Sequence, residues 1–365
     1  GYYSGTSKNS NGGGSNTVIT GKHVTMNNGD VKLYGNNNIG VSSSFVTQYY
    51  QPEERYLYYR LSNGYWSEAT HIFYKYSTNK IVLNTPVTVL GDESIGVSIG
   101  RILSFADSKI KADVGTEDPR QNVASITGHN GLENSGNVSG GNALYTDSSS
   151  GIYINMEDNK VEEWVDIYDE IDPSKNVSTR RIVIKNPQFT LSDYLVNMGS
   201  YSRGGAGVRV EEYGDVILGA SSDSSTSHEI NLLAGSENNA GIYTSGGNVQ
   251  VTTDGTAVNI DGTSQVGVQI ENNSKFYHNN GTITVNGMNN TGMAVKSTGY
   301  GELNNTGLIN TGAYNLGVYN NGTFVMNGGT VKADGLSSAG VYSEAGNRAT
   351  TLAGGTVRAE NGGMG

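Results

Sequence analysis

Residues 317–342 read GVYNNGTFVMNGGTVKADGLSSAGVY. The stretch begins at Gly317-Val318, and an equal pair returns at Gly340-Val341, while the apolar runs between them follow Gly-Thr at 322–325 and 329–331. Asn-Gly and Gly-Gly pairs separate these runs and are typical of turns. The pattern predicts a unit of three strands, each of about three to five residues. Such a unit has too little apolar surface to fold alone, so we expect it to stack on its copies.

The Gly-aliphatic pair of this stretch recurs along the whole chain. Its last five occurrences are 26, 25, 25 and 23 residues apart, and such a period is a signature of solenoid folds. We therefore expect the most regular coils over residues 233–365. The nine pairs are Gly40-Val41, Gly96-Val97, Gly151-Ile152, Gly207-Val208, Gly241-Ile242, Gly267-Val268, Gly292-Met293, Gly317-Val318 and Gly340-Val341.

Stacking at the usual strand spacing of about 4.8 Å would pair each strand in parallel with its equivalent one coil away. The predicted fold class is all-β, a right-handed parallel β-helix with about 25 residues per coil and hairpin-like insertions, in a single unit over 1–365. A helical solenoid is excluded because Gly recurs every few residues, and each Gly inside a helix costs about 1 kcal/mol. An antiparallel sandwich is a weaker competitor, since its strands would repeat about every 8–12 residues.

Corners between the strands need a backbone with positive φ, which Gly accepts and Asn tolerates better than most residues. We therefore expect the Asn runs at 36–38, 272–273, 279–280 and 304–305 to lie at corners. There their side-chain amides can also stack from coil to coil as hydrogen-bonded ladders.

The composition fits neither an ordinary globular domain nor a disordered chain. Of 365 residues 52 are Gly, hydrophobic residues make up 35% and charged residues 16%. The net charge of −11 is spread over the chain, whereas disorder is typical of low hydrophobicity combined with a high net charge. The acidic balance argues against nucleic-acid binding, which needs a cationic surface.

Cysteine is absent, which excludes disulfide scaffolds, zinc ribbons and thiol catalysis. There is no apolar run of about 18 residues, so we expect no membrane insertion by this segment. The chain begins with GYYSGTSKNSNGGGS instead of a basic and then apolar signal segment. We therefore expect a mature protein or an excised piece of one.

The period fails in the first 187 residues. All five prolines lie there, and the Gly-aliphatic pairs are 56, 55 and 56 residues apart. We predict two insertions in this part of the chain, at 45–80 and 156–187.

The insertion at 45–80 is rich in aromatic residues. Residues 55–61 alternate, and Asn63-Gly64 is a dipeptide favoured between antiparallel strands, so a hairpin is predicted. Its aromatic side chains either cover one side of the coils or contact a sugar or protein partner, for which large faces with polar edges are suited. The candidate binding residues are Tyr56, Tyr58, Tyr59, Tyr65, Trp66, Phe73, Tyr74 and Tyr76.

The insertion at 156–187 divides by charge. Acidic residues dominate up to Asp172-Pro173, and Arg180, Arg181 and Lys185 follow. An acidic arm that folds back on a basic arm would pair unlike charges in a hairpin, but the apolar spacing of the first arm also fits a short helix. The segment is either a solvated, self-neutralising hairpin or a site for a cationic ligand, with the candidate residues Glu162, Glu163, Trp164, Asp166 and Asp169.

The sequence lacks the residue patterns typical of an enzyme or of a cofactor site. Glycan-cleaving enzymes need paired carboxylates, whereas the acidic residues of 233–365 are isolated and the closest pair is Asp254 and Asp261. The five histidines never take the spacing of metal ligands. We expect no enzymatic activity, no metal and no cofactor.

The units GVYNNGTF (317–324), NGGTVKA (327–333), AGVY (339–342) and AGIY (240–243) resemble passenger repeats of large bacterial type V autotransporter adhesins, especially the very large fusobacterial outer-membrane adhesins. The resemblance covers 233–365 well and the earlier residues only through the widely spaced pairs. It implies a passenger at the bacterial cell surface, anchored to the outer membrane by a barrel outside this chain. A passenger crosses that membrane unfolded, and a cysteine-free chain whose coils fold locally suits the route.

The resemblance also implies a role in virulence, as an adhesin that attaches to host cells or to other bacteria. The implied partners are a host glycan of the galactose or N-acetylgalactosamine type, an immune receptor such as TIGIT, or a partner bacterium in coaggregation that arginine inhibits. Two other functions stay open: a β-helix polysaccharide lyase, hydrolase or tailspike, and a structural spacer without any site.

Overall fold

The computed structural model of the chain describes residues 16–21, 23–29, 31–34, 36–43, 52–60, 66–74, 79–100, 108–117, 146–156, 161–167, 178–184, 189–219, 228–346 and 348–365. Residues 52–60, 66–74, 161–167 and 178–184 are described by their backbone alone. The described residues form strands and turns without a helix, which confirms the predicted all-β class. Among them, accordingly, no helix is long and apolar enough to cross a membrane.

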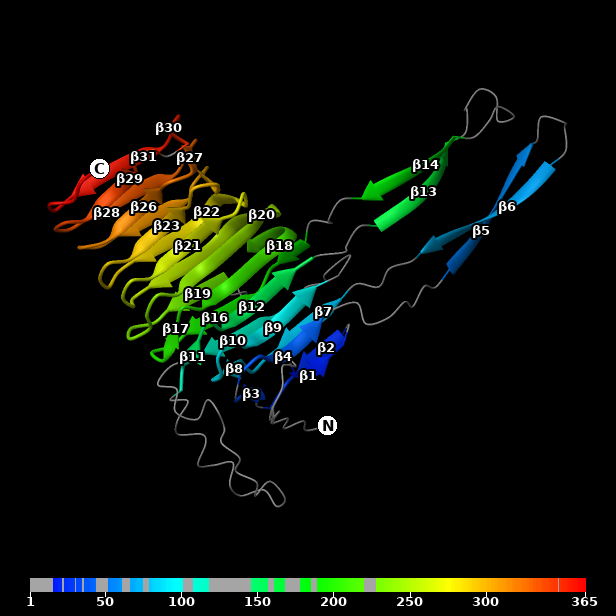
Figure 1. Cartoon of the computed structure of the whole chain (residues 1–365), viewed down its shortest axis with the longest axis horizontal. Helices are drawn as coiled ribbons and strands as arrows, with labels where there is room; N and C mark the ends of the chain where they lie inside the picture. The colour runs from blue at the N-terminus through cyan, green and yellow to red at the C-terminus, as the bar shows by residue number, and fades with distance from the viewer. Residues whose placement is uncertain are drawn as a thin grey trace, which may run out of the picture.

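The strands that contain the nine Gly-aliphatic pairs stack into one parallel ladder, here called wall 1 (Figure 1). Val41, Val97 and Ile152 stand in register on successive coils, and this register continues to Val341. Wall 1 consists of β1 (Asn16–Thr20), β4 (Asn38–Ser43), β9 (Ile95–Gly100), β12 (Ser150–Asn155), the first parts of β18 (Ala206–Gly219) and β20 (Ala240–Ile260), β21 (Val266–Glu271), β23 (Thr291–Val295), β26 (Leu316–Asn320) and β29 (Ala339–Ser343).

Two further sets of parallel strands complete each coil, and the chain passes from wall 1 to wall 2, then to wall 3 and back to wall 1. Wall 2 has two parts. In the first, β2 (His23–Met26) and β7 (Lys80–Leu83) form a separate two-stranded parallel sheet. The second is a longer ladder of β15 (Phe189–Leu191), the later part of β18, the middle of β20, the first part of β22 (Lys275–Val285), β24 (Tyr300–Leu303), β27 (Thr323–Met326) and β30 (Ala349–Leu352). Wall 3 consists of β3 (Val31–Leu33), β8 (Val87–Val89), β10 (Ile110–Val114), β16 (Tyr194–Met198), β19 (His228–Leu232), the ends of β20 and β22, β25 (Leu308–Thr311), β28 (Thr330–Asp334) and β31 (Thr356–Glu360).

The three walls curve around a continuous core. In many strands of the walls the side chains alternate between the core and the outside, as in the intermediate-buried alternation of β28. The buried aliphatic and aromatic side chains form one cluster that extends from Val24 to Val331 along the stack, and the largest of them are Tyr194, Phe276 and Phe324. In the described part of the chain, parallel pairing of equivalent residues one coil apart therefore gives a solenoid-like sheet of 23 strands.

The glycines of wall 1 are required by close packing. A Cβ built on Gly241 would lie 2.6 Å from the carbonyl oxygen of Gly267 on the next coil and 2.8 Å from the Cγ1 of Val258 in wall 3. From Gly40 to Gly317, every wall 1 glycine meets the carbonyl oxygen of its successor at less than 3.0 Å in this way. No larger residue fits there, because the backbones of adjacent coils and the inward side chains of wall 3 occupy the space.

Just before each of these glycines, the corner between walls 3 and 1 repeats a backbone conformation. The third residue before Gly has positive φ on successive coils, for example 55° at Asn238, 56° at Ser264, 59° at Asn289 and 60° at Tyr314. Asn is among the residues that tolerate this left-handed region. The predicted Asn corners are confirmed at Asn37, Asn272, Asn273 and Asn305, all of which have positive φ. The predicted corner at 279–280 is wrong, because both residues lie within β22 and neither has positive φ.

The second residue before each glycine carries a buried polar side chain along much of the stack. The N–H of Asn239 donates to Oε1 of Gln265 (2.8 Å), the N–H of Gln265 to Oδ1 of Asn290 (2.7 Å), and the N–H of Asn290 to Oδ1 of Asn315 (2.8 Å). These bonds satisfy backbone donors at a corner where the strand ladder is interrupted. An internal amide ladder therefore joins the coils in addition to the strands. The predicted stacking of Asn279 with Asn304 is also observed, at 3.1 Å.

Two antiparallel hairpins interrupt the coils. In the first, β5 (Pro52–Arg60) pairs with β6 (Trp66–Tyr74), as the sequence predicts. In the second, β13 (Val161–Ile167) pairs with β14 (Ser178–Ile184), so the first arm is a strand and the alternative of a short helix is wrong. A short parallel pair, β11 (Thr146–Asp147) with β17 (Ser202–Arg203), lies outside the walls.

Candidate functional site

The predicted aromatic site lies on the first hairpin. Register places Tyr58 opposite Glu68, Tyr59 opposite Ser67 and Tyr56 opposite Thr70. Alternation along a strand then assigns Tyr56, Tyr58, Trp66 and Tyr74 to one face of the hairpin, and Tyr59 and Phe73 to the other. The aromatic positions are thus divided between two faces. Tyr65 and Tyr76 lie outside the described residues.

The predicted acidic site lies on the second hairpin, in β13. Its register places Trp164 opposite Arg181 and Val165 opposite Arg180, whereas Glu162 and Glu163 stand opposite Val183 and Ile182. The expected direct pairing of carboxylates with arginines is therefore wrong. Glu163 is instead a diagonal neighbour of Arg180, and Asp166 of Arg181. Asp169 lies outside the described residues.

Both hairpins leave the coils at the same corner, between walls 1 and 2. The first insertion follows Ser43 at the end of β4, and the second follows β12 and Met156. Because β4 and β12 are both neighbours of β9 in wall 1, the two exit points are two strand spacings apart, about 10 Å. At the return point of the first insertion, the side-chain amide of Asn79 donates to Oγ of Ser43 (2.9 Å). The topology therefore gathers both predicted sites at one edge of the stack.

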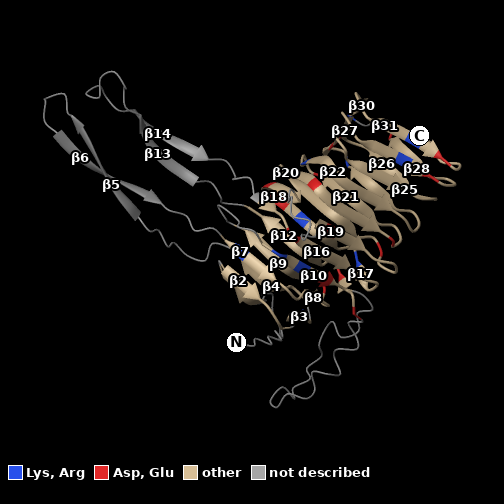
Figure 2. Ribbon diagram, turned by 180° about the vertical axis from the view of Figure 1, so that it is seen from behind, with Lys and Arg blue, Asp and Glu red and all other residues tan. Residues whose placement is uncertain are grey.

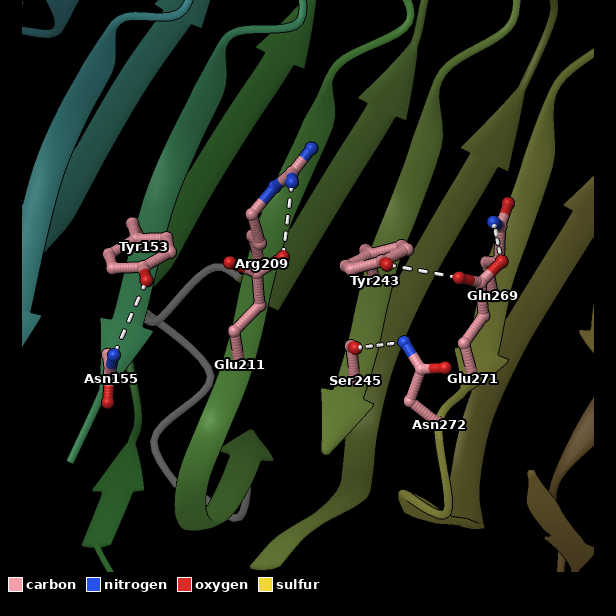
Figure 3. A network of polar contacts seen from close by, with 9 residues as sticks. All are labelled: Tyr153, Asn155, Arg209, Glu211, Tyr243, Ser245, Gln269, Glu271 and Asn272. Atoms are coloured by element: carbon pink, nitrogen blue, oxygen red, sulfur yellow. Dashed lines mark hydrogen bonds and ion pairs between the residues drawn. The ribbon is translucent and has the colours of Figure 1, made fainter. Parts of the chain in front are cut away.

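The outer face of wall 1 continues directly from the second exit point and holds a network of polar and aromatic side chains (Figure 3). The residues two positions after the wall 1 glycines form one row across four coils: Tyr153, Arg209, Tyr243 and Gln269. The residues two positions further on form a second row: Asn155, Glu211, Ser245 and Glu271. We call these two rows the tyrosine face.

Several contacts of the tyrosine face join its own residues. The guanidinium carbon of Arg209 lies 4.9 Å from the centroid of the Tyr243 ring, and Nη1 of Arg209 is 3.2 Å from Oε1 of Glu211. The hydroxyl of Tyr243 donates to Oε2 of Glu271 (3.1 Å), and Nε2 of Gln269 donates to Oε1 of the same carboxylate (2.6 Å). The hydroxyl of Tyr243, the carboxamide of Gln269 and the carboxylates of Glu211 and Glu271 are therefore each oriented by a neighbour one coil away or two residues away.

Burial at this face changes the acidity of its phenols. Burial raises the pKa of Tyr153, and the nearby carboxylates of Glu211 and Glu212 raise it further. Burial likewise raises the pKa of Tyr243, and Glu271 adds to the effect. Both hydroxyls thus remain protonated donors at neutral pH.

Further along wall 1 the row is interrupted and then resumes. Ala294 follows Gln269 and is buried, and after it the ring of Tyr319 stacks on Tyr342 at a centroid distance of 6.0 Å. Nζ of Lys296 lies 5.5 Å from the centroid of the Tyr319 ring, and the Tyr319 hydroxyl donates to Glu344. Such stacked pairs stabilise adjacent coils.

The described residues include no group of three or more His, Cys, Asp or Glu side chains that could hold a metal ion. Two of the histidines have structural surroundings: Nε2 of His228 is 2.7 Å from the carbonyl oxygen of Ser192, and Nδ1 of the buried His278 is 2.7 Å from Oγ1 of Thr253. Among the groups described, the tyrosine face presents hydroxyls, amides, carboxylates and aromatic rings.

Comparison of the chain with protein-family models, with curated proteins and with solved structures gave no match. The resemblance of the repeat units to autotransporter passengers therefore stays a prediction.

Reasoning from the sequence overlooked the tyrosine face. Its signal is present in the repeat, since every member lies two or four positions after a wall 1 glycine. The residues at these positions differ in type from coil to coil, so the row becomes visible only once the coils are aligned on their glycines. The aromatic content of the first insertion is a stronger local signal and drew the prediction there.

Proposed function

We propose that this chain is a passenger segment of a large type V autotransporter adhesin, and that its coils form a right-handed parallel β-helix exposed at the bacterial cell surface. The period, the parallel pairing one coil apart and the absence of cysteine support the proposal. Coils that contact only their neighbours can fold one after another, which suits a chain that emerges unfolded from one end. In this role the stack is a rigid carrier and is not an enzyme.

The two hairpins contact the partner, which is a host glycan of the galactose or N-acetylgalactosamine type or a protein receptor. The observation that carries this proposal is that both hairpins leave the stack at one corner, on coils about 10 Å apart. A regular carrier with its irregular segments on one edge presents them together. Aromatic positions on the first hairpin supply large contact area at a small loss of conformational entropy.

The test is binding of the purified chain to host cells and to immobilised galactose or receptor ectodomain. Replacing Tyr58, Tyr59, Tyr65 and Trp66 together with Ala should weaken binding at least about tenfold and leave the melting temperature nearly unchanged. Tyr277→Ala, on the outside of wall 2, is the matched control and should bind normally. Unchanged binding by the fourfold variant, or loss of binding only together with loss of folding, would contradict the proposal.

A second candidate is coaggregation with another bacterium that arginine inhibits. It is favoured by the acidic positions of β13, where Glu162, Glu163 and Asp166 lie on one arm of the second hairpin. Replacing these three residues with their amides should abolish arginine-sensitive coaggregation. If changes in neither hairpin affect attachment, the segment is a spacer. If the chain releases sugar products from a glycan that it binds, it is an enzyme.

A further inference from the structure

The tyrosine face has the composition of a surface that recognises hydroxyl groups. Within four adjacent coils it presents phenol, guanidinium, carboxylate and carboxamide groups together with the rings of Tyr153 and Tyr243 (Figure 3). Planar polar groups with two donors or two acceptors match a pair of neighbouring hydroxyls. Arg209 lies over one face of the Tyr243 ring, which leaves the other face of that ring and the ring of Tyr153 for the apolar side of a pyranose. The internal hydrogen bonds already fix these groups, so little ordering is needed when a ligand binds.

The charges of the face decide between ligand classes. An anionic chain is disfavoured, because Glu211 and Glu271 lie at the face and the chain as a whole has a net charge of −11. A cationic peptide is disfavoured for a different reason: Arg209 already lies over the Tyr243 ring at 4.9 Å, and its guanidinium is paired with Glu211. Most of the ribbon of the wall strands consists of residues other than Lys, Arg, Asp and Glu (Figure 2). A neutral ligand rich in hydroxyls fits both observations.

The spacing of the face suits a polymer. Equivalent side chains of adjacent coils repeat at the strand spacing of about 4.8 Å, which is close to the length of one pyranose unit in an extended glycan. Tyr153 stands in register with Arg209, Arg209 with Tyr243, and Tyr243 with Gln269. A chain laid along the stack would therefore meet one such side chain for every sugar unit.

We propose that the outer face of wall 1, from β12 to β21, binds a neutral, extended polysaccharide that lies along the stack with one sugar unit per coil. This site is separate from the hairpins and does not rest on the proposed role of the chain as an adhesin. The ring of Tyr243 and the carboxamide of Gln269 contact the sugars, while Arg209 and Glu271 position them.

The proposal is tested by electrophoresis of the purified full chain in native gels that contain a soluble polysaccharide. The neutral probes are dextran, galactan, galactomannan and hydroxyethyl cellulose, and the acidic probe is alginate. At least one neutral probe should retard the chain and alginate should not. The double variant Tyr243→Ala/Gln269→Ala should lose affinity about tenfold, and Tyr243→Phe, which keeps the ring but loses the bond to Glu271, should lose less.

The controls separate this site from the others. Tyr277→Ala, a tyrosine of wall 2, should be retarded like the unchanged chain, as should the fourfold hairpin variant even where it no longer binds cells. Retardation by none of the neutral probes would overturn the proposal, and so would retardation that the double variant leaves unchanged. Binding of an oligoarginine peptide that Tyr243→Ala abolishes, without any retardation by neutral probes, would assign the face to a protein partner instead.

Discussion

At single positions, the fold depends most on the glycines of wall 1. Gly241→Ala would place a methyl group 2.6 Å from the carbonyl oxygen of Gly267 and 2.8 Å from the Cγ1 of Val258. Because two neighbouring coils must separate to admit it, we expect a loss of about 1–3 kcal/mol in the free energy of unfolding, measured by urea denaturation. Gly247→Ala is the control, since its added Cβ would meet only the Cβ of Asn273 at 3.8 Å. Equal stability of the two variants would show that the coils are not closely packed at Gly241.

Tyr314 offers the opposite test. It has φ of 60° at a corner position that Asn289 and Ser337 occupy on the neighbouring coils, and its side chain is 49% exposed. A bulky residue in the left-handed region costs roughly 1–2 kcal/mol, so Tyr314→Asn should raise the melting temperature. A lower melting temperature would mean that contacts of the ring outweigh the backbone strain.

His278 should make the stack sensitive to acid. Burial lowers the pKa of His278 from the ordinary 6.5 to about 4, although the backbone carbonyls of Leu308 and Gly281 oppose the shift. The unfolded chain therefore takes up the proton first as the pH falls. The stability that His278 contributes is complete above pH 6.5 and is lost progressively as the pH falls towards 4.

Urea denaturation between pH 7 and pH 4 checks this expectation. The free energy of unfolding of the unchanged chain should fall more steeply than that of His278→Gln, by about 3 kcal/mol over the whole range. The comparison cancels the carboxylates, which both proteins share. If the free energy of unfolding has the same pH dependence in both proteins, His278 has the same pKa in the folded and the unfolded chain, which would contradict the expectation.

The sequence revealed some of these residues and not others, for physical reasons. Where the backbones of adjacent coils approach closely, only Gly fits. The wall 1 glycines are therefore the same residue on every coil and are visible as a repeat in the sequence. The internal amide ladder needs only a polar side-chain acceptor, and Gln265 and Asn290 both supply one on adjacent coils. The residue types of the tyrosine face can vary even more, since outward positions are not constrained by packing in the core. Predictability from the sequence thus declines from the backbone to the core to the surface.

Among the elements, the first hairpin should be dispensable for folding. The side chains of Ser43 and Asn79 are joined by a hydrogen bond of 2.9 Å, so the coil is already closed where the insertion leaves and returns. Replacing residues 44–78 with a short Gly-Asn turn should leave the circular dichroism spectrum dominated by the coils and the melting temperature almost unchanged. Loss of the cooperative transition would instead make the hairpin part of the folding unit.

The hairpins also show what local sequence can and cannot predict. Asn63-Gly64 between alternating runs predicted the pairing of β5 with β6 because a two-residue turn fixes a hairpin locally. In the second insertion the apolar residues Val161, Trp164 and Val165 fit a helical period as well as a strand, and no tight turn decided between them. Pairing with β14 did, which is an interaction with residues further along the chain. The binding sites predicted on the two hairpins therefore still rest on the sequence alone. The pairing partner of each candidate residue became known only from the strand register.

For the molecule as a whole, the period carried the prediction furthest. A repeat of about 25 residues has room for three short strands per coil. Once coils of equal length stack, their equivalent residues must pair in parallel, so the period alone predicts the strand pairing. The shared corner from which both hairpins leave was not predicted, because it depends on which wall ends at each insertion. The nearly constant spacing of the glycines likewise predicts the most regular coils over 233–365.

The central claim is that equivalent residues stack one strand spacing apart along a single axis. Because the chain lacks cysteine, pairs of cysteines can be introduced on the outside of wall 1 and spin-labelled, with one label at Tyr342 and the other in turn at Gln269, Tyr243, Arg209 or Tyr153. Measured by pulsed electron resonance, the label distance should grow by about 4.8 Å per coil, reaching about 29 Å between Tyr153 and Tyr342, six coils apart. Distances that do not increase steadily from coil to coil would contradict the stacked arrangement.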